Sequence, residues 1–405
     1  MGMLETPGRI EPCLLETVAP DIADRIAELT ARATALGARL HPLTAASIAE
    51  IVRTMNCYYS NLIEGHNTMP RDIERALDRD LDGDLRRRQL QREAAAHIYV
   101  QSLVDGRATR DELDEPASII FVRWLHERFY MPSPDISSTM PVLVGHDGAG
   151  EKAIALAPGE FRFSPEHDVT VGLHHPPSGH VVRAFMEHFE RRYAFAKLGP
   201  AQRILAIPAA HHRLNYIHPF IDGNGRVSRL MSHAMALKAG IGAHGLWAVS
   251  RGLARGLKSR SEYKAMMNHA DMPRQNDYDG RGNLSEKALG DFTRWFLDTM
   301  IDQTSFMAGL FELESMEDRL RRYVKSAPHL PAEAADLLVY VMLKGEMARG
   351  EASRATGLKE RSARSVLSAV EADGLLVSAT PKGPVRLHFT VDATDILFPR
   401  LFPES

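Results

Sequence analysis

The sequence has very little cysteine: only Cys13 and Cys57 occur among its 405 residues. So few thiols fit a reducing compartment, and they exclude both a disulfide scaffold and a cysteine-rich metal finger. No run of about 18 apolar residues is present, and the N-terminal segment lacks the basic and apolar regions of a secretory signal. We therefore expect a cytoplasmic protein with no segment in a membrane.

Net charge is also small. The chain has 49 Lys and Arg against 52 Asp and Glu, a formal net charge of −3. This balance excludes attraction of the whole chain to nucleic acid or to an anionic membrane, so any anion must be bound by a local group of residues. Internal repeats and low-complexity segments are missing too, which argues against solenoid and fibrous proteins. The length of 405 residues predicts about two or three domains.

Helical periodicity, by contrast, runs through most of the chain. Apolar residues recur at three- and four-residue spacing over residues 18–105, 181–237 and 284–323. Between the first two stretches, residues 145–177 alternate apolar and polar positions among turn residues, which predicts a β-hairpin. We therefore predict a mainly α-helical fold with one small hairpin.

A separate C-terminal unit is predicted after a linker at residues 326–331. Residues 331–390 have the order of a winged helix-turn-helix, three short helices and a hairpin that turns at Lys382-Gly383-Pro384. Eight basic residues against seven acidic ones make this unit a weak candidate for binding a DNA duplex. DNA recognition and contact with a protein or a second copy both stay open as interpretations. The basic residues around its second and third helices are Arg349, Arg354, Lys359, Arg361 and Arg364.

The segment from His218 to Arg229 is the most informative part of the sequence. It reads His-Pro-Phe-Ile-Asp-Gly-Asn-Gly-Arg-Val-Ser-Arg. Gly223 and Gly225 permit positive φ and close backbone approach, so successive N–H groups can converge on an anion where the next helix begins. Arg226 and Arg229 lie three residues apart on one face of that helix, and their guanidinium groups suit phosphate oxygens. The segment therefore predicts a phosphate-binding loop.

Two more side chains of this segment suggest a reaction as well as binding. Asp222 places a hard carboxylate beside the loop, where Mg²⁺ that bridges phosphate oxygens would bind. His218 is the one nearby group that can accept a proton near neutral pH. Each residue alone has a structural explanation, but their combination indicates phosphate chemistry. The residues alone leave open whether attack falls on the α- or the γ-phosphate.

This segment resembles the core motif of the Fic family, HxFx[DE]GNGRxxR, at every specified position. The resemblance implies a helical core with a small β-hairpin flap, and transfer of AMP from ATP to a Ser, Thr or Tyr hydroxyl of a target protein with Mg²⁺ as cofactor. It also implies a role for each residue: His218 as general base, Asp222 on the Mg²⁺ at the α- and β-phosphates, Phe220 as anchor of the loop, Gly223, Asn224 and Gly225 as anion hole, Arg226 on the leaving pyrophosphate, Arg229 on the γ-phosphate, and Val227 and Ser228 as part of the same nucleotide-binding segment.

A second motif lies upstream, at residues 60–65, with the sequence Ser-Asn-Leu-Ile-Glu-Gly. Ser60 and Glu64 are four residues apart at the end of a predicted helix, so they share a face, and Gly65 can end that helix. The segment resembles the Fic inhibitory motif [ST]xxxE[GN], in the class where it precedes the catalytic motif. The resemblance implies that Glu64 pairs with Arg229 and takes the place of the γ-phosphate. Removal of AMP with the help of the same glutamate stays open.

Two other segments are similar to parts of the Fic nucleotide site. Residues 169–177 resemble the flap that docks the target and overlies the nucleotide, with Val171, Gly172 and His174 as candidate contacts. Tyr263 lies in a segment that resembles the lining of the adenine site, where an aromatic face suits stacking on the base. A lone aromatic residue on a helix is equally consistent with a place in the core.

The sequence thus predicts a helical layer with the inhibitory helix at residues 1–110, a catalytic core at 111–325 and a winged helix at 331–390. The leading hypothesis is a protein adenylyltransferase inhibited by Glu64. The alternatives are an enzyme that also removes AMP, a different phosphate or nucleotide donor, and a transcription regulator whose core senses nucleotide. The presence of His218 favours an enzyme, because a sensor needs no base. The expected partner is a target protein, while a homodimer and DNA stay open.

Overall fold

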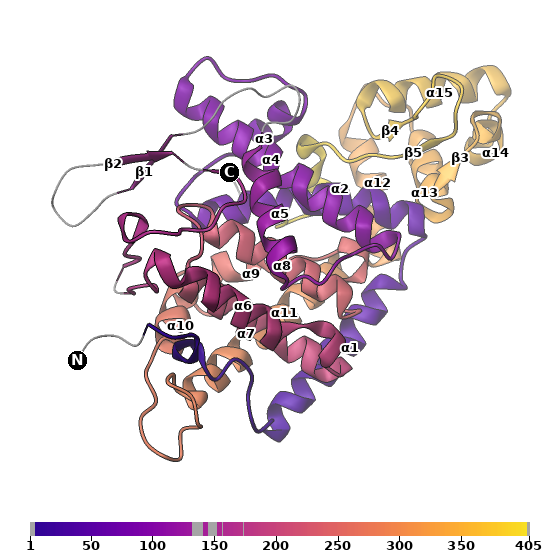
Figure 1. Cartoon of the computed structure of the whole chain (residues 1–405). Helices are drawn as coiled ribbons and strands as arrows, with labels where there is room; N and C mark the ends of the chain where they lie inside the picture. The colour runs from indigo at the N-terminus through magenta and orange to yellow at the C-terminus, as the bar shows by residue number, and fades with distance from the viewer. Residues whose placement is uncertain (1–4, 132–140, 145–151, 156, 173, 403–405) are drawn as a thin grey trace.

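The computed structural model describes residues 5–131, 141–144, 152–155, 157–172 and 174–402, and these residues are mainly helical (Figure 1). The helices pack around one continuous apolar core that reaches from the N-terminal layer into the C-terminal unit. In the part of the chain described, every helix is too short or too polar to cross a bilayer.

Most of the chain is helical, and the few strands are short. The helices are α1 Pro20–Gly37, α2 Pro42–Ile63, α3 Pro70–Leu77, α4 Leu85–Thr109, α5 Ile119–Tyr130, α6 Val182–Tyr193, α7 Pro200–Ile217, α8 Asn224–Lys238, α9 Ser250–Arg255, α10 Glu262–Ala270, α11 Glu286–Leu310, α12 Leu313–Ser326, α13 Ala334–Lys344, α14 Ala352–Thr356, α15 Glu360–Asp373 and α16 Thr394–Leu397. The strands are β1 Pro141–Val144, β2 Lys152–Ala155, β3 Glu346–Met347, β4 Leu376–Val377 and β5 Val385–Leu387.

The N-terminal helices form because their apolar residues repeat at helical spacing. In α1, Ile22, Ile26 and Leu29 are buried on the side that packs against α11. Helix α2 is buried along almost its whole length, because α4, α9 and the C-terminal unit cover it from several sides. A helix covered in this way has a fixed position, so its last turn can place side chains accurately.

Helices α7 and α8 lie against each other in the middle of the protein, and α4, α5 and α11 pack around them. Nearly every residue of α8 from Arg226 to Ala236 is buried. The loop of residues 218–223 joins these two central helices. It is therefore held at both ends by the best-packed part of the core.

The hairpin differs from the sequence prediction. β1 and β2 pair in antiparallel fashion with Pro141 opposite Ala155, so the first strand lies ahead of the predicted range 145–177. Within residues 169–177 there is one isolated bridge, between Val171 and His174, instead of two strands; Leu173 lies outside the described residues. The alternation of apolar and polar residues shows where a turn-rich segment lies. It does not show where each strand begins and ends, because that depends on which residues pair across the hairpin.

The C-terminal unit follows a short non-helical segment between α12 and α13. Its elements run α13, β3, α14, α15, β4 and β5, and β5 is the central strand of a three-stranded antiparallel sheet. The unit rests on the first half of α2 (Figure 1). Arg386 Nη1 donates to Glu50 Oε1 at 3.0 Å, and Thr44 Oγ1 donates to the Met342 carbonyl at 2.7 Å. Helix α2 is thus held by the C-terminal unit at its start.

Candidate active site

The loop between α7 and α8 is fixed by left-handed backbone positions and by one side chain. His218 ends α7 with φ 50° and ψ 60°, and Gly223 precedes α8 with φ 80°. A Cβ at Gly223 would lie 2.7 Å from the Tyr130 hydroxyl oxygen, so glycine alone fits. The Asn224 side chain accepts from the Phe220 N–H at 2.9 Å and donates to the Phe220 carbonyl at 2.8 Å. The Asn224 side chain therefore holds the loop through both backbone polar groups of Phe220.

Phe220 anchors this loop in the core. Its side chain is fully buried, and its ring stacks on the His126 ring with centroids 3.9 Å apart. His126 Nδ1 accepts from the Gly159 N–H at 2.8 Å, so the proton is on Nε2, which donates to the Asp222 carbonyl at 3.2 Å. Burial lowers the pKa of His126 to about 4, which keeps this ring neutral.

Arg229, in the second turn of α8, is bound by the end of α2. Its Nη2 donates to Glu64 Oε1 at 2.5 Å, and its Nε donates to Ser60 Oγ at 2.9 Å. Ser60 and Glu64 therefore act from one side of the helix end, and Gly65, with φ 83°, follows where α2 stops. Burial acts to raise the pKa of Glu64, but the Arg229 guanidinium outweighs burial and lowers that pKa, so the carboxylate is ionised at neutral pH.

The Glu64 carboxylate lies directly over the backbone of Gly225. A Cβ at Gly225 would lie 2.5 Å from Glu64 Oε1 and 3.0 Å from Arg229 Nη1. Glycine is therefore required for the carboxylate and the guanidinium to meet here. The position is the start of α8, where backbone N–H groups favour negative charge. Glu64 thus already fills an anion position, although 33% of its side chain stays exposed to solvent.

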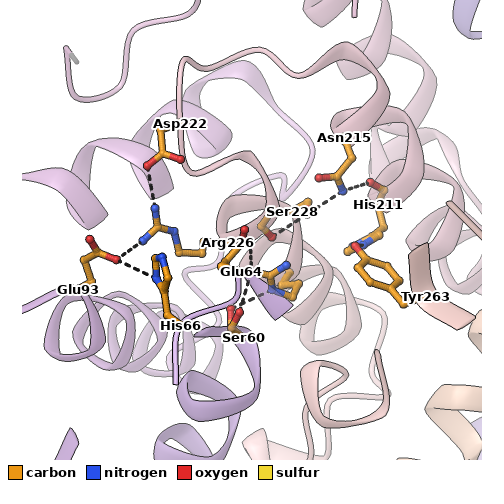
Figure 2. A network of polar contacts seen from close by, with 12 residues as sticks. Ser60, Glu64, His66, Glu93, His211, Asn215, Asp222, Arg226, Ser228 and Tyr263 are labelled. Carbon is orange, nitrogen blue, oxygen red and sulfur yellow. Dashed lines mark hydrogen bonds and ion pairs between the residues drawn. The ribbon is translucent and has the colours of Figure 1, made fainter. Parts of the chain in front are cut away.

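Arg226 lies between two carboxylates (Figure 2). Its Nη1 donates to Glu93 Oε2 at 2.7 Å, and its Nη2 donates to Asp222 Oδ2 at 2.9 Å. The Tyr130 hydroxyl donates to the same Asp222 oxygen at 2.6 Å and accepts from Arg226 at 2.7 Å. His66 lies 3.7 Å from Glu93 on the other side. Glu93 and Tyr130 hold the guanidinium in place. Neither could be predicted from the sequence, because each is a single residue on a helix far away in the chain.

Asp222 is suited to a metal ion as well as to Arg226. Burial acts to raise the pKa of Asp222, but Arg226 and the Tyr130 hydroxyl outweigh burial and lower that pKa. The side chain is 42% exposed, so the ionised carboxylate is accessible. Mg²⁺ commonly takes one or two carboxylates and completes its shell with phosphate oxygens and water. The donor present at Asp222 therefore fits Mg²⁺ in the presence of a phosphate ligand.

Arg162 connects the loop to the flap segment, residues 169–177. This buried side chain donates from Nε to the His218 carbonyl at 2.8 Å and from Nη2 to the Pro177 carbonyl at 2.9 Å. Burial first, and then the positive charge of Arg162, lowers the pKa of His218 to about 4. The imidazole is consequently neutral at pH 7, the form that can accept a proton. Arg162 is a further residue that no motif marked in the sequence.

We expect an NMR titration of the His218 imidazole to show its inflection near pH 4, far below the ordinary value of about 6.5. Comparison with His218→Gln identifies the signal. Because the folded pKa lies below the ordinary value, the stability that the neutral ring contributes is complete above about pH 6.5 and is lost as the pH falls towards about 4. An inflection near the ordinary value would show a solvated ring, contrary to the structure.

The three flap candidates differ in their surroundings. His174 is engaged by the protein: its Nε2 lies 2.7 Å from the Tyr216 carbonyl, and its Nδ1 lies 3.4 Å from Asp271. Val171 is 43% exposed, and a Cβ at Gly172 would meet nothing within 4 Å. Val171 and Gly172 therefore offer free surface, whereas the His174 ring supports the end of α7.

Tyr263 lies in the core of this structure, as the second of its two interpretations expects. The residue is buried, its hydroxyl lies 2.8 Å from His211 Nε2, and its ring is stacked with Trp295 at a centroid distance of 6.3 Å. Burial raises its pKa to about 12. The alternative of a core residue describes it better, because protein groups contact both the ring and the hydroxyl. Val227 and Ser228 are buried in the same scaffold, and Ser228 Oγ donates to the Gly225 carbonyl at 2.8 Å.

Comparison with known proteins identifies relatives of this region. Residues 136–236 match the Fic/DOC family. Over 82 residues the chain is 39% identical to the protein adenylyltransferase Fic of Drosophila erecta, which covers 20% of this chain and 16% of that protein. Over 147 residues it is 31% identical to the protein of the same name from Drosophila mojavensis, which covers 35% of this chain and 28% of that one. The chain thus matches less than a third of the length of these relatives.

A solved structure shares the fold over most of the chain. It is a Fic family protein from Desulfovibrio desulfuricans G20, with a TM-score of 0.51 at 16% sequence identity. The match covers 92% of this chain and 98% of that one. At this identity the likeness concerns the fold alone.

Proposed function

From the Fic/DOC match at residues 136–236 and the geometry around it, we propose that this protein is an adenylyltransferase that transfers AMP from ATP to a Ser, Thr or Tyr hydroxyl of a target protein. The observation that carries the proposal is the convergence at one helix start of a neutral His218, an ionised Asp222 and the guanidinium groups of Arg226 and Arg229. The adenylyltransferases of the two flies, which match part of this chain, support the same assignment.

The proposed reaction uses each of these groups once. The target hydroxyl oxygen attacks the α-phosphorus, the bond from that phosphorus to the bridging oxygen breaks, and pyrophosphate leaves. His218 accepts the hydroxyl proton, which its lowered pKa permits at neutral pH. The backbone N–H groups at Gly225 and the guanidinium groups of Arg226 and Arg229 stabilise the charge that builds up on the phosphates. Mg²⁺ held by Asp222 would supply further positive charge on the phosphate oxygens.

We also propose that Glu64 inhibits this reaction. Its carboxylate binds Arg229 at 2.5 Å and covers Gly225, so it takes the guanidinium that the γ-phosphate needs. A second negative charge at this place would also repel the nucleotide. The contact supports inhibition in the absence of any partner, because both groups belong to one chain.

For the C-terminal unit we propose a winged helix that contacts protein. Its order of elements and its three-stranded sheet support the first part. Arg349 is bound twice by Glu371, at 2.9 and 2.6 Å, and Arg364 lies 3.4 Å from Glu360. These partners neutralise part of the basic cluster that a duplex would need. We keep residues 1–110, 111–325 and 331–390 as the proposed domains.

Labelled ATP tests the proposed reaction. The Glu64→Gly variant is incubated with ATP labelled at the α- or at the γ-phosphate, and label bound to protein is counted. Label from the α-position alone is expected, because AMP stays on the target and pyrophosphate leaves. Label from the γ-position would instead show phosphate transfer, and an absence of both would remove the enzyme assignment.

A further inference from the structure

A second group of arginines lies behind the end of α2. They surround a cavity of about 270 Å³ that is lined by Arg251 and Arg255 of α9, by Arg260 and Arg400, and by the aromatic residues Tyr59 and Phe402. The lining contains no Asp or Glu. Within the described part of the chain, these four arginines also form no ion pair with a carboxylate elsewhere.

Arg251 shows that the cavity is built into the fold. The residue is 2% exposed, and its Nε is buried without a hydrogen-bond partner among the described residues. Its other nitrogens are held by neutral oxygens, Gln303 Oε1 at 3.3 Å and the Arg400 carbonyl at 3.1 Å, and its guanidinium lies 3.6 Å from the centroid of the Phe306 ring. Burial lowers the pKa of Arg251 to about 10, so the group remains charged at pH 7. The Asp302 carboxylate acts on this charge without forming an ion pair with it. A buried cation with no carboxylate in contact is costly unless an anion joins it.

This cavity is separate from the loop that begins α8. Tyr59 and Leu62 line it, and they lie on the same side of α2 because they are three residues apart. Ser60 follows Tyr59 directly, and Glu64 lies two residues after Leu62. At 3.6 residues per turn both therefore point to another side of the helix end, where they bind Arg229. The two arginine groups therefore use different faces of one helix end.

We propose that this cavity is a binding site for a small phosphorylated molecule. Arg255, Arg260 and Arg400 are exposed and can turn their guanidinium groups towards phosphate oxygens, which they bind in bidentate fashion. Phe402 gives one side of the cavity an aromatic surface against which a nucleobase can pack, whereas Tyr59 is only 3% exposed. A volume of about 270 Å³ suits a pyrophosphate or a small nucleotide and is too small for a nucleic acid.

The test is calorimetric titration with inorganic pyrophosphate and, separately, with ADP. Every protein in the test carries Arg229→Ala, so that binding at the loop before α8 is weakened and does not mask the cavity. In this background, the further changes Arg255→Ala and Arg260→Ala are expected to weaken binding at least about tenfold, because each lost hydrogen bond to a charged group weakens binding by roughly this factor. The matched control is Arg86→Ala/Arg191→Ala, which removes the same charge from two exposed positions elsewhere. It is expected to bind within about twofold of the Arg229→Ala protein, since distant charges are screened by salt.

Several outcomes decide the matter. Tighter binding of ADP than of pyrophosphate would support a nucleotide as the ligand, and equal binding would support the phosphate groups alone. Equal loss in both double variants, or no binding of either compound to the Arg229→Ala protein, would overturn the proposal.

Discussion

Replacing Glu64 by glycine is expected to raise the incorporation of AMP into the protein itself by at least about tenfold. Glu64 holds Arg229 through a hydrogen bond of 2.5 Å between charged groups. Such bonds contribute about 1.5–3 kcal/mol, and the partial exposure of the Glu64 side chain places this one towards the lower end. Without this contact Arg229 is free to bind a phosphate, and we expect the rate of incorporation to rise by the factor that corresponds to this free energy. Radiolabel from α-labelled ATP, counted on the purified protein over time, measures the gain.

Glu64→Gln separates the charge of Glu64 from its bulk. Glutamine keeps the size of the side chain and one acceptor oxygen. We therefore expect its rate of incorporation to lie between the rates of the parent protein and of the glycine variant. Glu112→Gly is a matched control, because Glu112 is an exposed glutamate that binds Arg110 outside the site. It is expected to leave incorporation unchanged. A folded Glu64→Gly protein with the activity of the parent would rule out inhibition by this residue.

Replacing His218 by alanine in the Glu64→Gly background is expected to lower AMP incorporation by about 10²–10⁴-fold, the range that a general base contributes. The background matters because the parent protein is expected to be too slow for the loss to be measured. His218 is a neutral ring at the end of α7, because its pKa is lowered to about 4. The initial rate at saturating ATP is the quantity to compare.

Two further measurements show whether the lower rate of His218→Ala comes from the reaction step or from weaker ATP binding. ATP affinity, measured by calorimetry, is expected to stay within about threefold, because the anion position is formed by α8 and its arginines rather than by the ring. His180→Ala is the control, since His180 is an exposed histidine bonded to Ser178. It is expected to keep full activity. If His218→Ala retains more than about one tenth of the rate, another group accepts the proton.

The site could be predicted from sequence where its parts are adjacent in the chain. Glycines, arginines and a carboxylate within residues 218–229 already fix a loop and one helix face, and the spacing of Ser60 and Glu64 fixes a second face. The pairing of Glu64 with Arg229 came from the resemblance, and the structure shows this contact at 2.5 Å. Local geometry is reliable in such cases because few backbone conformations satisfy it.

The rest of the site depends on tertiary packing that no local pattern encodes. Tyr130, Glu93 and Arg162 lie on three separate segments. Each enters the site only because α5, α4 and the loop that contains Arg162 pack around α8 and the loop before it. Tyr263 depends on packing in the same way, since its aromatic ring suits a ligand or the core, and in this structure it contacts His211 and Trp295. Whether such a side chain belongs to the site depends on the groups that it contacts in the folded protein, and its residue type alone does not predict this.

If Glu64 inhibits as proposed, its contact with Arg229 places a competing anion on the same chain as the guanidinium that it occupies. The effective concentration of a tethered competitor is set by geometry, here by the packing of α2, and is the same however dilute the protein becomes. Dilution or washing therefore cannot remove it, whereas a small shift of α2 can. Because α2 also carries the C-terminal unit at its start, the stiffness of this one helix sets how strongly any phosphate must compete for Arg229.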